Sequence, residues 1–333
     1  MEMMSEALAN IPTVVRILSQ RGAPSASRLA PHMPGGSLDQ GDIRFTVDAE
    51  PADVVVVLNY LKYDTTLVAK RGYFWAWHNE PINRKPFARG LDRIFTHEVS
   101  SDPRVSNAPP ILDWWVGKSW DELNTLHVPE KKRGMSAIAS DKTVIAGHRR
   151  RHAFVNLVEK TLPEIEVFGK GRPNALGDKW DGLAPFKYSV AIENTSKRDY
   201  WTEKIADCFL SYTVPIYFGA TNIADYFPED SFIWLPLGDP KLALQTLESV
   251  LENDSWNDRL SALHEARKRV LREYCFWGQL TTRIRREAHQ IQRARMTSRR
   301  VHGRRVRPRG WVRNAGVVGN IRQELERRAR RSQ

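Results

Sequence analysis

A chain of 333 residues with 41% hydrophobic residues is long enough for two domains of ordinary size, and this composition excludes a disordered protein. Its formal charge of +12 lies at one end, since residues 283–333 hold 17 arginines, no lysine and three glutamates, which leaves −2 on residues 1–282. Only two cysteines are present, and no run approaches the ~20 apolar residues of a membrane span. We therefore expect a cytoplasmic protein without a disulfide framework.

The first part of the chain predicts strands separated by loops. Short apolar runs rich in β-branched or aromatic residues predict four strands, over residues 13–18, 43–47, 54–58 and 73–77. Residues 21–41 are rich in glycine, proline and serine and predict a loop. The fourth strand is followed at once by a polar stretch that contains Glu80. Ligands of open α/β sheets bind at the carboxyl ends of strands, so Glu80 is a candidate site residue.

Residues 107–134 contain a pair of prolines and a charged run, and they predict the link between two domains. A second α/β unit follows, with strands over residues 135–139 and 166–168 and a helix over residues 149–162. Three positive side chains stand at the start of this helix, namely Arg149, Arg150 and Arg151. Positive charge opposes the helix dipole at an N-terminus, so these arginines indicate a bound anion.

The central unit of the chain, residues 186–219, predicts a strand, a loop, a helix and a second strand. The run over residues 188–192 predicts a buried strand, and residues 214–218 predict its parallel neighbour. Between them, Asp199 predicts the N-cap of a helix that begins at Tyr200. The loop and the first helical turn place polar side chains at the carboxyl end of the first strand, namely Glu193, Asn194, Tyr200, Glu203 and Lys204.

A lysine in the first helical turn also opposes the helix dipole, which a bound diphosphate would explain. The alternative is an ion-pair cluster that faces solvent at the start of the helix. The chain then predicts a strand over residues 232–236 and amphipathic helices over residues 242–251 and 258–280.

The arginine-rich C-terminal segment is interrupted by glycine and proline, so we expect helices only over residues 283–300 and 321–331 and disorder elsewhere in it. Its arginines would bind phosphates of any kind, on an anionic lipid surface or on a nucleic acid. Few aromatic residues accompany the arginines, so a specific nucleic-acid partner is not expected.

The central unit resembles the signature region of glycosyltransferase family 10, the α-1,3/4-fucosyltransferases. In that family an aromatic strand leads into Glu-Asn, followed by Tyr-x-Thr-Glu-Lys and by a strand of the type Val-Pro-Ile-x-x-Gly. Here the three elements stand in the same order, as Ala-Ile-Glu-Asn, Tyr-Trp-Thr-Glu-Lys and Val-Pro-Ile-Tyr-Phe-Gly at residues 191–194, 200–204 and 214–219. The resemblance is strongest over residues 142–232, looser over residues 42–99 and absent from the C-terminal segment.

The resemblance implies an α/β protein of GT-B type, with two doubly wound, Rossmann-like domains that face each other across a cleft. We assign residues 1–130 to an acceptor-binding domain, residues 131–282 to a domain that binds a GDP-sugar, and residues 283–333 to a basic tail that is helical or disordered. Animal members of the family are anchored by an N-terminal membrane helix. This sequence shows no such apolar segment, so we expect it to be similar to the bacterial-type members, which are soluble or peripheral.

The resemblance also implies an inverting fucosyltransferase that moves L-fucose from GDP-β-L-fucose to a hydroxyl of a glycan acceptor, with an α-1,3-type linkage. Glu80 takes the place of the catalytic base, and Arg151 and Lys204 that of the cations at the diphosphate. The remaining donor-binding positions correspond to Glu193, Asn194, Tyr200 and Glu203. The sequence lacks the Asp-x-Asp metal signature, so we expect no required cofactor and at most stimulation by a divalent ion.

The sequence is also compatible with other functions. A family member could use another GDP-linked sugar, which the diphosphate-binding residues cannot distinguish. The arginine-rich segment could make the chain a nucleic-acid-binding protein, or could place the enzyme at the inner face of a membrane, where a lipid-linked glycan would be the acceptor. An inactive, lectin-like relative is a further alternative, which the intact set of Arg151, Glu203 and Lys204 argues against.

Overall fold

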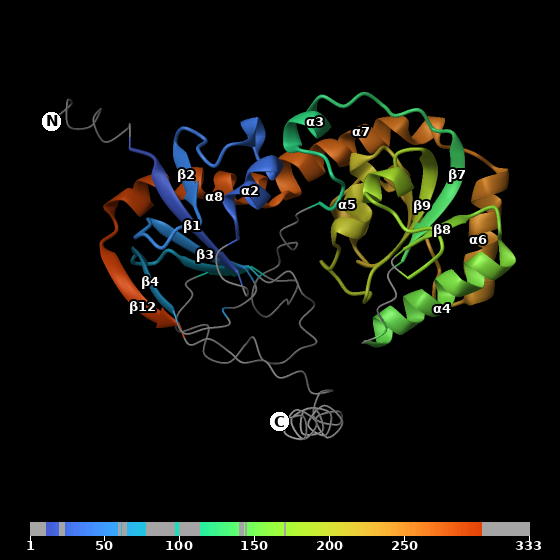
Figure 1. Ribbon diagram of the computed structural model, residues 1–333, viewed down its shortest axis with the longest axis horizontal. Helices are drawn as coiled ribbons and strands as arrows, with labels where there is room; N and C mark the ends of the chain where they lie inside the picture. The colour runs from blue at the N-terminus through green and yellow to red at the C-terminus, as the bar shows by residue number, and fades with distance from the viewer. Residues whose placement is uncertain are drawn as a thin grey trace, which may run out of the picture.

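The structure of the chain is a computed structural model. It describes residues 11–19, 24–58, 61, 65–77, 97–99, 114–139, 143, 145–169 and 171–301, with the backbone alone at 97–99. Two five-stranded parallel sheets form the two halves of the molecule, and the long helix α8 (Phe276–Arg293) runs back from the second half to the first (Figure 1). The predicted base Glu80 and the predicted helix over residues 321–331 lie outside the described residues.

The N-terminal sheet confirms the four strands predicted in this part of the chain. Its strands are β1 (Thr13–Ser19), β2 (Ile43–Thr46), β3 (Val54–Leu58), β5 (Phe74–Trp77) and β6 (His97–Val99), all parallel and ordered β2-β1-β3-β5-β6. The uniformly apolar β3 is buried on both faces, with Val54 and Val56 in one apolar cluster and Val55 and Val57 in another. The predicted loop over residues 21–41 contains short helices, namely α2 (Ala26–Leu29), η1 (Ala30–His32) and η2 (Pro34–Gly36).

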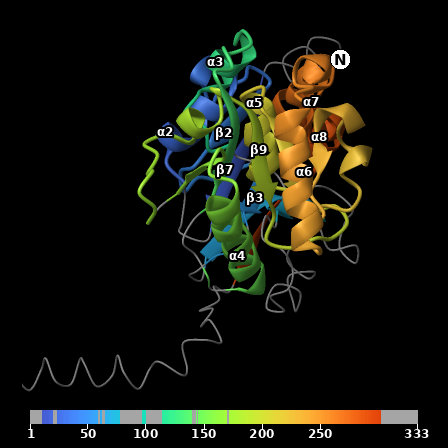
Figure 2. The ribbon, with the colours of Figure 1, turned by 90° about the vertical axis from the view of Figure 1, so that its right-hand side faces the viewer.

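The C-terminal sheet has the same strand order as the N-terminal one. Its strands are β7 (Arg133–Ile138), β8 (Glu166–Phe168), β9 (Phe186–Ile192), β10 (Val214–Phe218) and β11 (Ile233–Trp234), ordered β11-β10-β9-β7-β8 and all parallel. The helices of this half include α4 (Ala146–Thr161), α5 (Glu203–Leu210), α6 (Pro240–Glu252) and α7 (Leu260–Arg269), several of which are seen in Figure 2. Short 3-10 helices complete it, namely η3 (Lys179–Gly182), η4 (Ile223–Asp225), η5 (Glu229–Ser231) and η6 (Asn257–Arg259).

The direction of strand addition reverses between β7 and β9, because α4 leads from β7 outward to β8, whereas α5 leads from β9 to β10 on the other side. In a doubly wound sheet, ligands bind outside the carboxyl ends of the strands at such a reversal. The N-termini of α4 and α5 both lie at this edge, so the fold brings two helix N-termini to one place.

The segment that enters the C-terminal half is described from residue 114. Ser119 caps α3 (Trp120–Asn124) in a capping box with Glu122. On the C-terminal side, the indole N–H of Trp120 donates to the carbonyl of Leu271 at 3.2 Å. On the N-terminal side, the backbone N–H of Gly35 donates to Asp121 at 3.1 Å. The predicted link over residues 107–134 is therefore, from residue 114, a strap fixed to both halves.

The expected boundary at residue 282 is wrong, because it falls inside α8. The predicted helix over residues 258–280 is instead divided between α7 and α8 by the π-helical turn η7 (Val270–Tyr274) and by Cys275, whose backbone is extended. From there α8 lies against the N-terminal half: the rings of Trp277 and Phe45 are 4.8 Å apart, and the Arg283 guanidinium lies 4.7 Å from the ring of Trp75.

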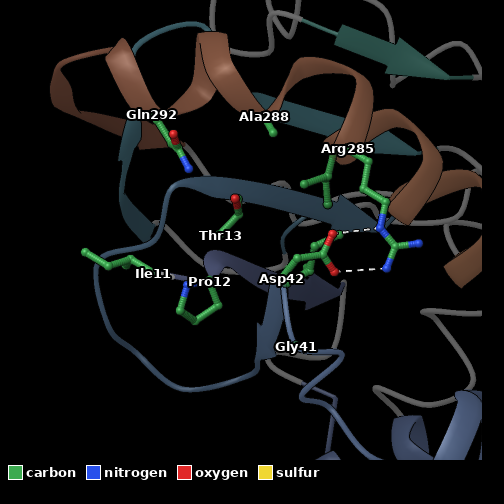
Figure 3. Close-up of a pocket in the computed structure, with 10 residues that line it drawn as sticks. Ile11, Pro12, Thr13, Gly41, Asp42, Arg285, Ala288 and Gln292 are labelled. Carbon is green, nitrogen blue, oxygen red and sulfur yellow. Dashed lines mark hydrogen bonds and ion pairs between the residues drawn. The ribbon is translucent and has the colours of Figure 1, made fainter. Parts of the chain in front are cut away.

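The chain continues from α8 into β12 (Met296–Val301), which pairs antiparallel with β4 (Thr65–Lys70). Arg285 of α8 forms a double ion pair with Asp42, at 2.8 and 2.9 Å (Figure 3). The pair borders a cavity of about 410 Å³ at the amino ends of β1 and β2. Residues 283–301 are thus part of the N-terminal half and not of a separate tail. The reason is that arginine side chains can cover apolar surface with their stems while their charged ends pair.

Within the described residues, no helix is both long and apolar enough to cross a membrane. Both cysteines, Cys208 and Cys275, are buried free thiols.

Candidate functional site

The start of α5 differs from the sequence prediction by three residues. The N-cap is Thr202, whose hydroxyl accepts the backbone N–H of Lys204, and the helix begins at Glu203 and not at Tyr200. Asp199 instead has a positive φ of 60°, and its carboxylate accepts hydrogen bonds from Asn222 at 2.8 Å and from Tyr226 at 2.6 Å. Asp199 therefore fixes the loop in front of the helix, and Thr202 is a site residue that the sequence reading missed.

Glu193, the first residue after β9, turns into the protein. Its side chain is fully buried and accepts both the backbone N–H and the hydroxyl of Thr202 at 2.7 Å. The ammonium of Lys204 lies 3.2 Å from its second carboxylate oxygen. Burial raises the pKa of Glu193, and the charge of Lys204 opposes that rise. Glu193 therefore connects the end of β9 to the start of α5 through its hydrogen bonds with Thr202, and it contacts Lys204 from the protein interior.

Lys204 has a neighbour for each of its three ammonium protons. Its Nζ lies 2.9 Å from the hydroxyl of Thr202, 3.1 Å from Glu203 and 3.2 Å from Glu193. Burial lowers the pKa of Lys204, but the two glutamates outweigh it and the net direction is upward. For Glu203, burial acts to raise the pKa, and the lysines at positions 204 and 179 lower it to about 2. Lys204 and Glu203 are therefore both charged at neutral pH.

Arg151 comes from the second turn of α4 and is 7% exposed. Its guanidinium donates to the side-chain oxygen of Asn194 at 2.7 Å. Burial lowers the pKa of Arg151, and Glu193 and Glu203 act in the opposite direction, so the arginine lies within their electric field. The first turn of α4 is also close to the loop after β9: a Cβ on Gly147 would lie 1.7 Å from the carbonyl oxygen of Asn194, which only glycine allows.

The structure thus places the six predicted donor residues in one region, at the strand reversal, although their roles differ. Arg151 pairs with Asn194, and Lys204 pairs with Glu203. Glu193 contacts Lys204 from the protein interior, and Tyr200 is buried at 2% exposure. Arg149 and Arg150 are exposed; Arg150 lies over the ring of Phe218 and Arg149 donates to the carbonyl of Thr143. Only the third of the three arginines at the start of the helix therefore belongs to the site.

A buried arginine, Arg151, and a partly buried lysine, Lys204, lie beside two helix N-termini, and this arrangement is suited to a ligand with two adjacent negative groups, such as a diphosphate. In the part of the chain that the structure describes, no three His, Cys, Asp or Glu side chains are grouped as metal ligands. Arg151 and Lys204 are protein groups that can stabilise anionic charge.

Residues 128–287 match the family model described as "Glycosyltransferase family 10 (fucosyltransferase) C-term". This part of the chain belongs to glycosyltransferase family 10. All six predicted donor residues lie within the family 10 region, whereas Glu80 precedes it.

Several curated proteins are similar to part of the chain. "Putative fucosyltransferase-like protein" of Arabidopsis thaliana is 29% identical over 148 residues, which are 44% of this chain and 27% of that protein. "Alpha-(1,3)-fucosyltransferase FucT" of Helicobacter pylori is 36% identical over 88 residues, 25% of this chain and 18% of that protein. The human "4-galactosyl-N-acetylglucosaminide 3-alpha-L-fucosyltransferase 9" is 26% identical over 168 residues, 48% of this chain and 44% of that protein. The chain thus matches less than half the length of each.

A solved "alpha1,3-Fucosyltransferase" has a similar fold, with a TM-score of 0.50 at 17% identity over 75% of this chain and 80% of that one. This likeness and the two doubly wound sheets confirm the predicted GT-B type fold. The three curated relatives come from a plant, a bacterium and a mammal, so the expectation of a bacterial-type member stays a prediction.

Proposed function

We propose that this chain is an inverting glycosyltransferase that moves L-fucose from GDP-β-L-fucose to a hydroxyl of a glycan acceptor, with an α-1,3-type linkage. The observation that supports this most concerns Arg151 of α4 and Lys204 of α5. These two positive side chains come from different helices and lie at the strand reversal of a family 10 domain. Curated relatives named as α-1,3-fucosyltransferases support the choice of sugar and linkage.

In the proposed reaction, the acceptor oxygen attacks the anomeric carbon as the bond between that carbon and the diphosphate breaks. Negative charge develops on the departing GDP, and Arg151 and Lys204 stabilise it as fixed positive charges in a largely buried site. Glu80 takes the proton of the attacking hydroxyl, a step that typically contributes ~10²–10⁴-fold. Attack opposite to the leaving group converts the β-linked donor into an α-linked product.

The other predicted donor residues have different parts in the proposal. Asn194, Tyr200 and Glu203 hold hydroxyls of the nucleotide or of the sugar. Glu193 acts indirectly, because both of its carboxylate oxygens are already bonded to Thr202 or Lys204 within the protein.

The proposal is tested by incubating the protein with a panel of nucleotide sugars and measuring nucleoside diphosphate release. GDP-fucose is expected to be turned over faster than GDP-mannose and UDP-glucose, and a mixture of glycan acceptors with free galactose and N-acetylglucosamine residues should raise the rate. A higher rate with another GDP-sugar would keep the transferase and replace the donor. No release from any GDP-sugar, together with no GDP binding, would contradict the proposal.

We expect transfer to continue in the presence of EDTA, because Arg151 and Lys204 supply the positive charge that a metal supplies elsewhere. The measurement compares initial rates before and after dialysis against the chelator, with Mg²⁺ added back as the control. A modest stimulation by Mg²⁺ agrees with the proposal. Complete loss of activity on chelation, restored by the metal, would show that the protein groups are not sufficient.

We also propose that the arginine-rich end of the chain binds an anionic membrane surface, so that a lipid-linked glycan can be the acceptor. Residues 302–333 hold ten arginines and two glutamates, and each arginine near an anionic surface contributes about 1 kcal/mol. Full-length protein is expected to co-sediment with vesicles containing phosphatidylserine, but not with phosphatidylcholine vesicles, and 1 M salt should reverse binding because the screening length falls to ~3 Å.

The matched control for this experiment ends at Val301 and not at residue 282. A chain cut at residue 282 would lack the second half of α8 and all of β12, which pack on the N-terminal half. If the chain ending at Val301 binds anionic vesicles as strongly as full-length protein, residues 302–333 are not the anchor. Binding of full-length protein to duplex DNA in preference to vesicles at 0.15 M salt would assign those residues to nucleic acid instead.

A further inference from the structure

Lys179 is a second lysine near the donor site that the sequence reading did not single out. It begins the short helix η3, which follows the N-cap Asp178. Its ammonium lies 2.7 Å from the carboxylate of Asp207, which is fully buried and stands one helical turn after Lys204 on α5. Burial lowers the pKa of Lys179, and the charges of Asp207 and Glu203 outweigh it and raise the pKa overall. Lys179 is therefore a charged group held against the helix that contains Lys204.

Lys179 and Lys204 converge on the same space. Both line a cavity of about 20 Å³ near the carboxyl end of β9, whose other walls include Ile192 and Cys208. A cavity of that size holds about one water molecule. Glu203 interacts electrostatically with both lysines, since the charge of each lowers the pKa of its carboxyl group. The glutamate therefore has two positive neighbours, of which the direct partner is Lys204 at 3.1 Å.

A diphosphate cannot bind Lys204 without disturbing these contacts. An ammonium has three protons, and the three neighbours of Lys204 are the side chains of Thr202, Glu203 and Glu193. A phosphate oxygen that accepts from Lys204 must replace or share at least one of them. Glu203 would then lose part of its positive partner while its side chain is only 29% exposed, and partial burial makes an unpaired charge unfavourable there.

We propose that Lys179 is a positioning residue of the donor site: it provides the second positive charge that holds Glu203 in place when Lys204 turns to the diphosphate. Asp207 orients Lys179 through the 2.7 Å contact, and its other oxygen accepts the backbone N–H of Trp115 at 3.1 Å. The same pair therefore fastens α5 to the strap that enters the C-terminal half. The inference rests on the proposed function, because it requires a ligand that contains a diphosphate.

The experiment measures GDP affinity by calorimetry in wild-type protein and in four variants. Lys179→Met alone would leave the carboxylate of Asp207 buried without a positive partner and could prevent folding. The main comparison is therefore between Asp207→Asn and the double variant Lys179→Met/Asp207→Asn, in which the buried partner is neutral and can still accept from Trp115. Lys179→Arg tests rescue by another positive group. Lys118→Met removes a lysine on the neighbouring strap that pairs with Glu122 at the surface.

The double variant is expected to bind GDP on the order of 10-fold more weakly than Asp207→Asn at a similar unfolding temperature, as for loss of one interaction with a charged group. Its KM for the sugar nucleotide should rise more than its kcat falls. Lys179→Arg should stay within about threefold of wild type, and Lys118→Met should match wild type. Equal GDP affinity in the double variant and in Asp207→Asn would overturn the inference. Failure of wild-type protein to bind GDP would instead overturn the proposed function, so the two failures are distinguishable.

Discussion

Replacement of Lys204 with alanine is expected to lower kcat/KM for the sugar nucleotide by about 10²–10³-fold, the range for removal of one group that stabilises charge in the transition state. GDP binding should also weaken, because part of the diphosphate charge is left without a partner in a site of low dielectric constant. Arg151→Ala should act in the same direction, since Arg151 is the buried positive group on the other side of the strand reversal. Calorimetric titration with GDP and steady-state rates with GDP-fucose measure both effects.

Arg150→Ala is the matched control for this pair. Arg150 stands on the same helix as Arg151, but its side chain is exposed over the ring of Phe218, so GDP affinity should stay within about twofold of wild type. Unfolding temperatures must accompany the titrations, because Lys204→Ala also leaves Glu193 without its positive partner. Folded Lys204→Ala and Arg151→Ala proteins that bind GDP as tightly as wild type would contradict the donor-site assignment.

Replacement of Glu80 with glutamine is expected to lower the transfer rate by about 10²–10⁴-fold while GDP affinity stays within about twofold of wild type. The reason is that a general base acts on the acceptor hydroxyl and not on the nucleotide. Glu80 follows β5 by three positions in the sequence, at the end of a strand where parallel sheets bind ligands. Rates with GDP-fucose and an acceptor, together with GDP titration, separate the two steps.

A Glu80→Gln protein that transfers fucose at a rate near that of wild type would remove Glu80 from the mechanism. Glu98 would then be the first carboxylate to test, because it lies on β6, beside β5 at the edge of the same sheet. Loss of GDP affinity in Glu80→Gln would be a different result, which would place Glu80 in the donor site.

The sequence alone determined the strands that form the centre of each half. Runs such as Val54–Leu58 and Val214–Phe218 are short, largely apolar and rich in β-branched residues, and this combination favours a strand that is covered on both faces. The sequence also determined the grouping of Glu193, Asn194, Glu203 and Lys204, because these residues lie within twelve positions on one loop and one helical turn. Local pattern was sufficient there because the partners are close in the chain.

Only the tertiary structure decided which of these groups face the ligand edge and which support it. The N-cap of α5 is Thr202 and not the predicted Asp199. The carboxylate of Asp199 instead accepts a hydrogen bond from Asn222, which lies 23 positions later in the chain. Lys179 lies 25 positions before Lys204, and no local pattern connects the two, yet both line one cavity. Such contacts depend on how strands and helices pack, and pairing energies between distant residues leave no periodic trace in the sequence.

The same holds for the arginines of α8 and β12. In the sequence, residues 283–301 have the composition of a solvated basic segment, since arginine is the most frequent residue type in them. In the structure Arg285 pairs with Asp42, 243 positions earlier, and β12 completes a two-stranded sheet with β4. An arginine side chain has both an apolar stem and a charge that can be paired. The arginine content of a segment therefore does not reveal whether the segment faces solvent or packs on another domain. That choice depends on the surface that the N-terminal half presents once it has folded.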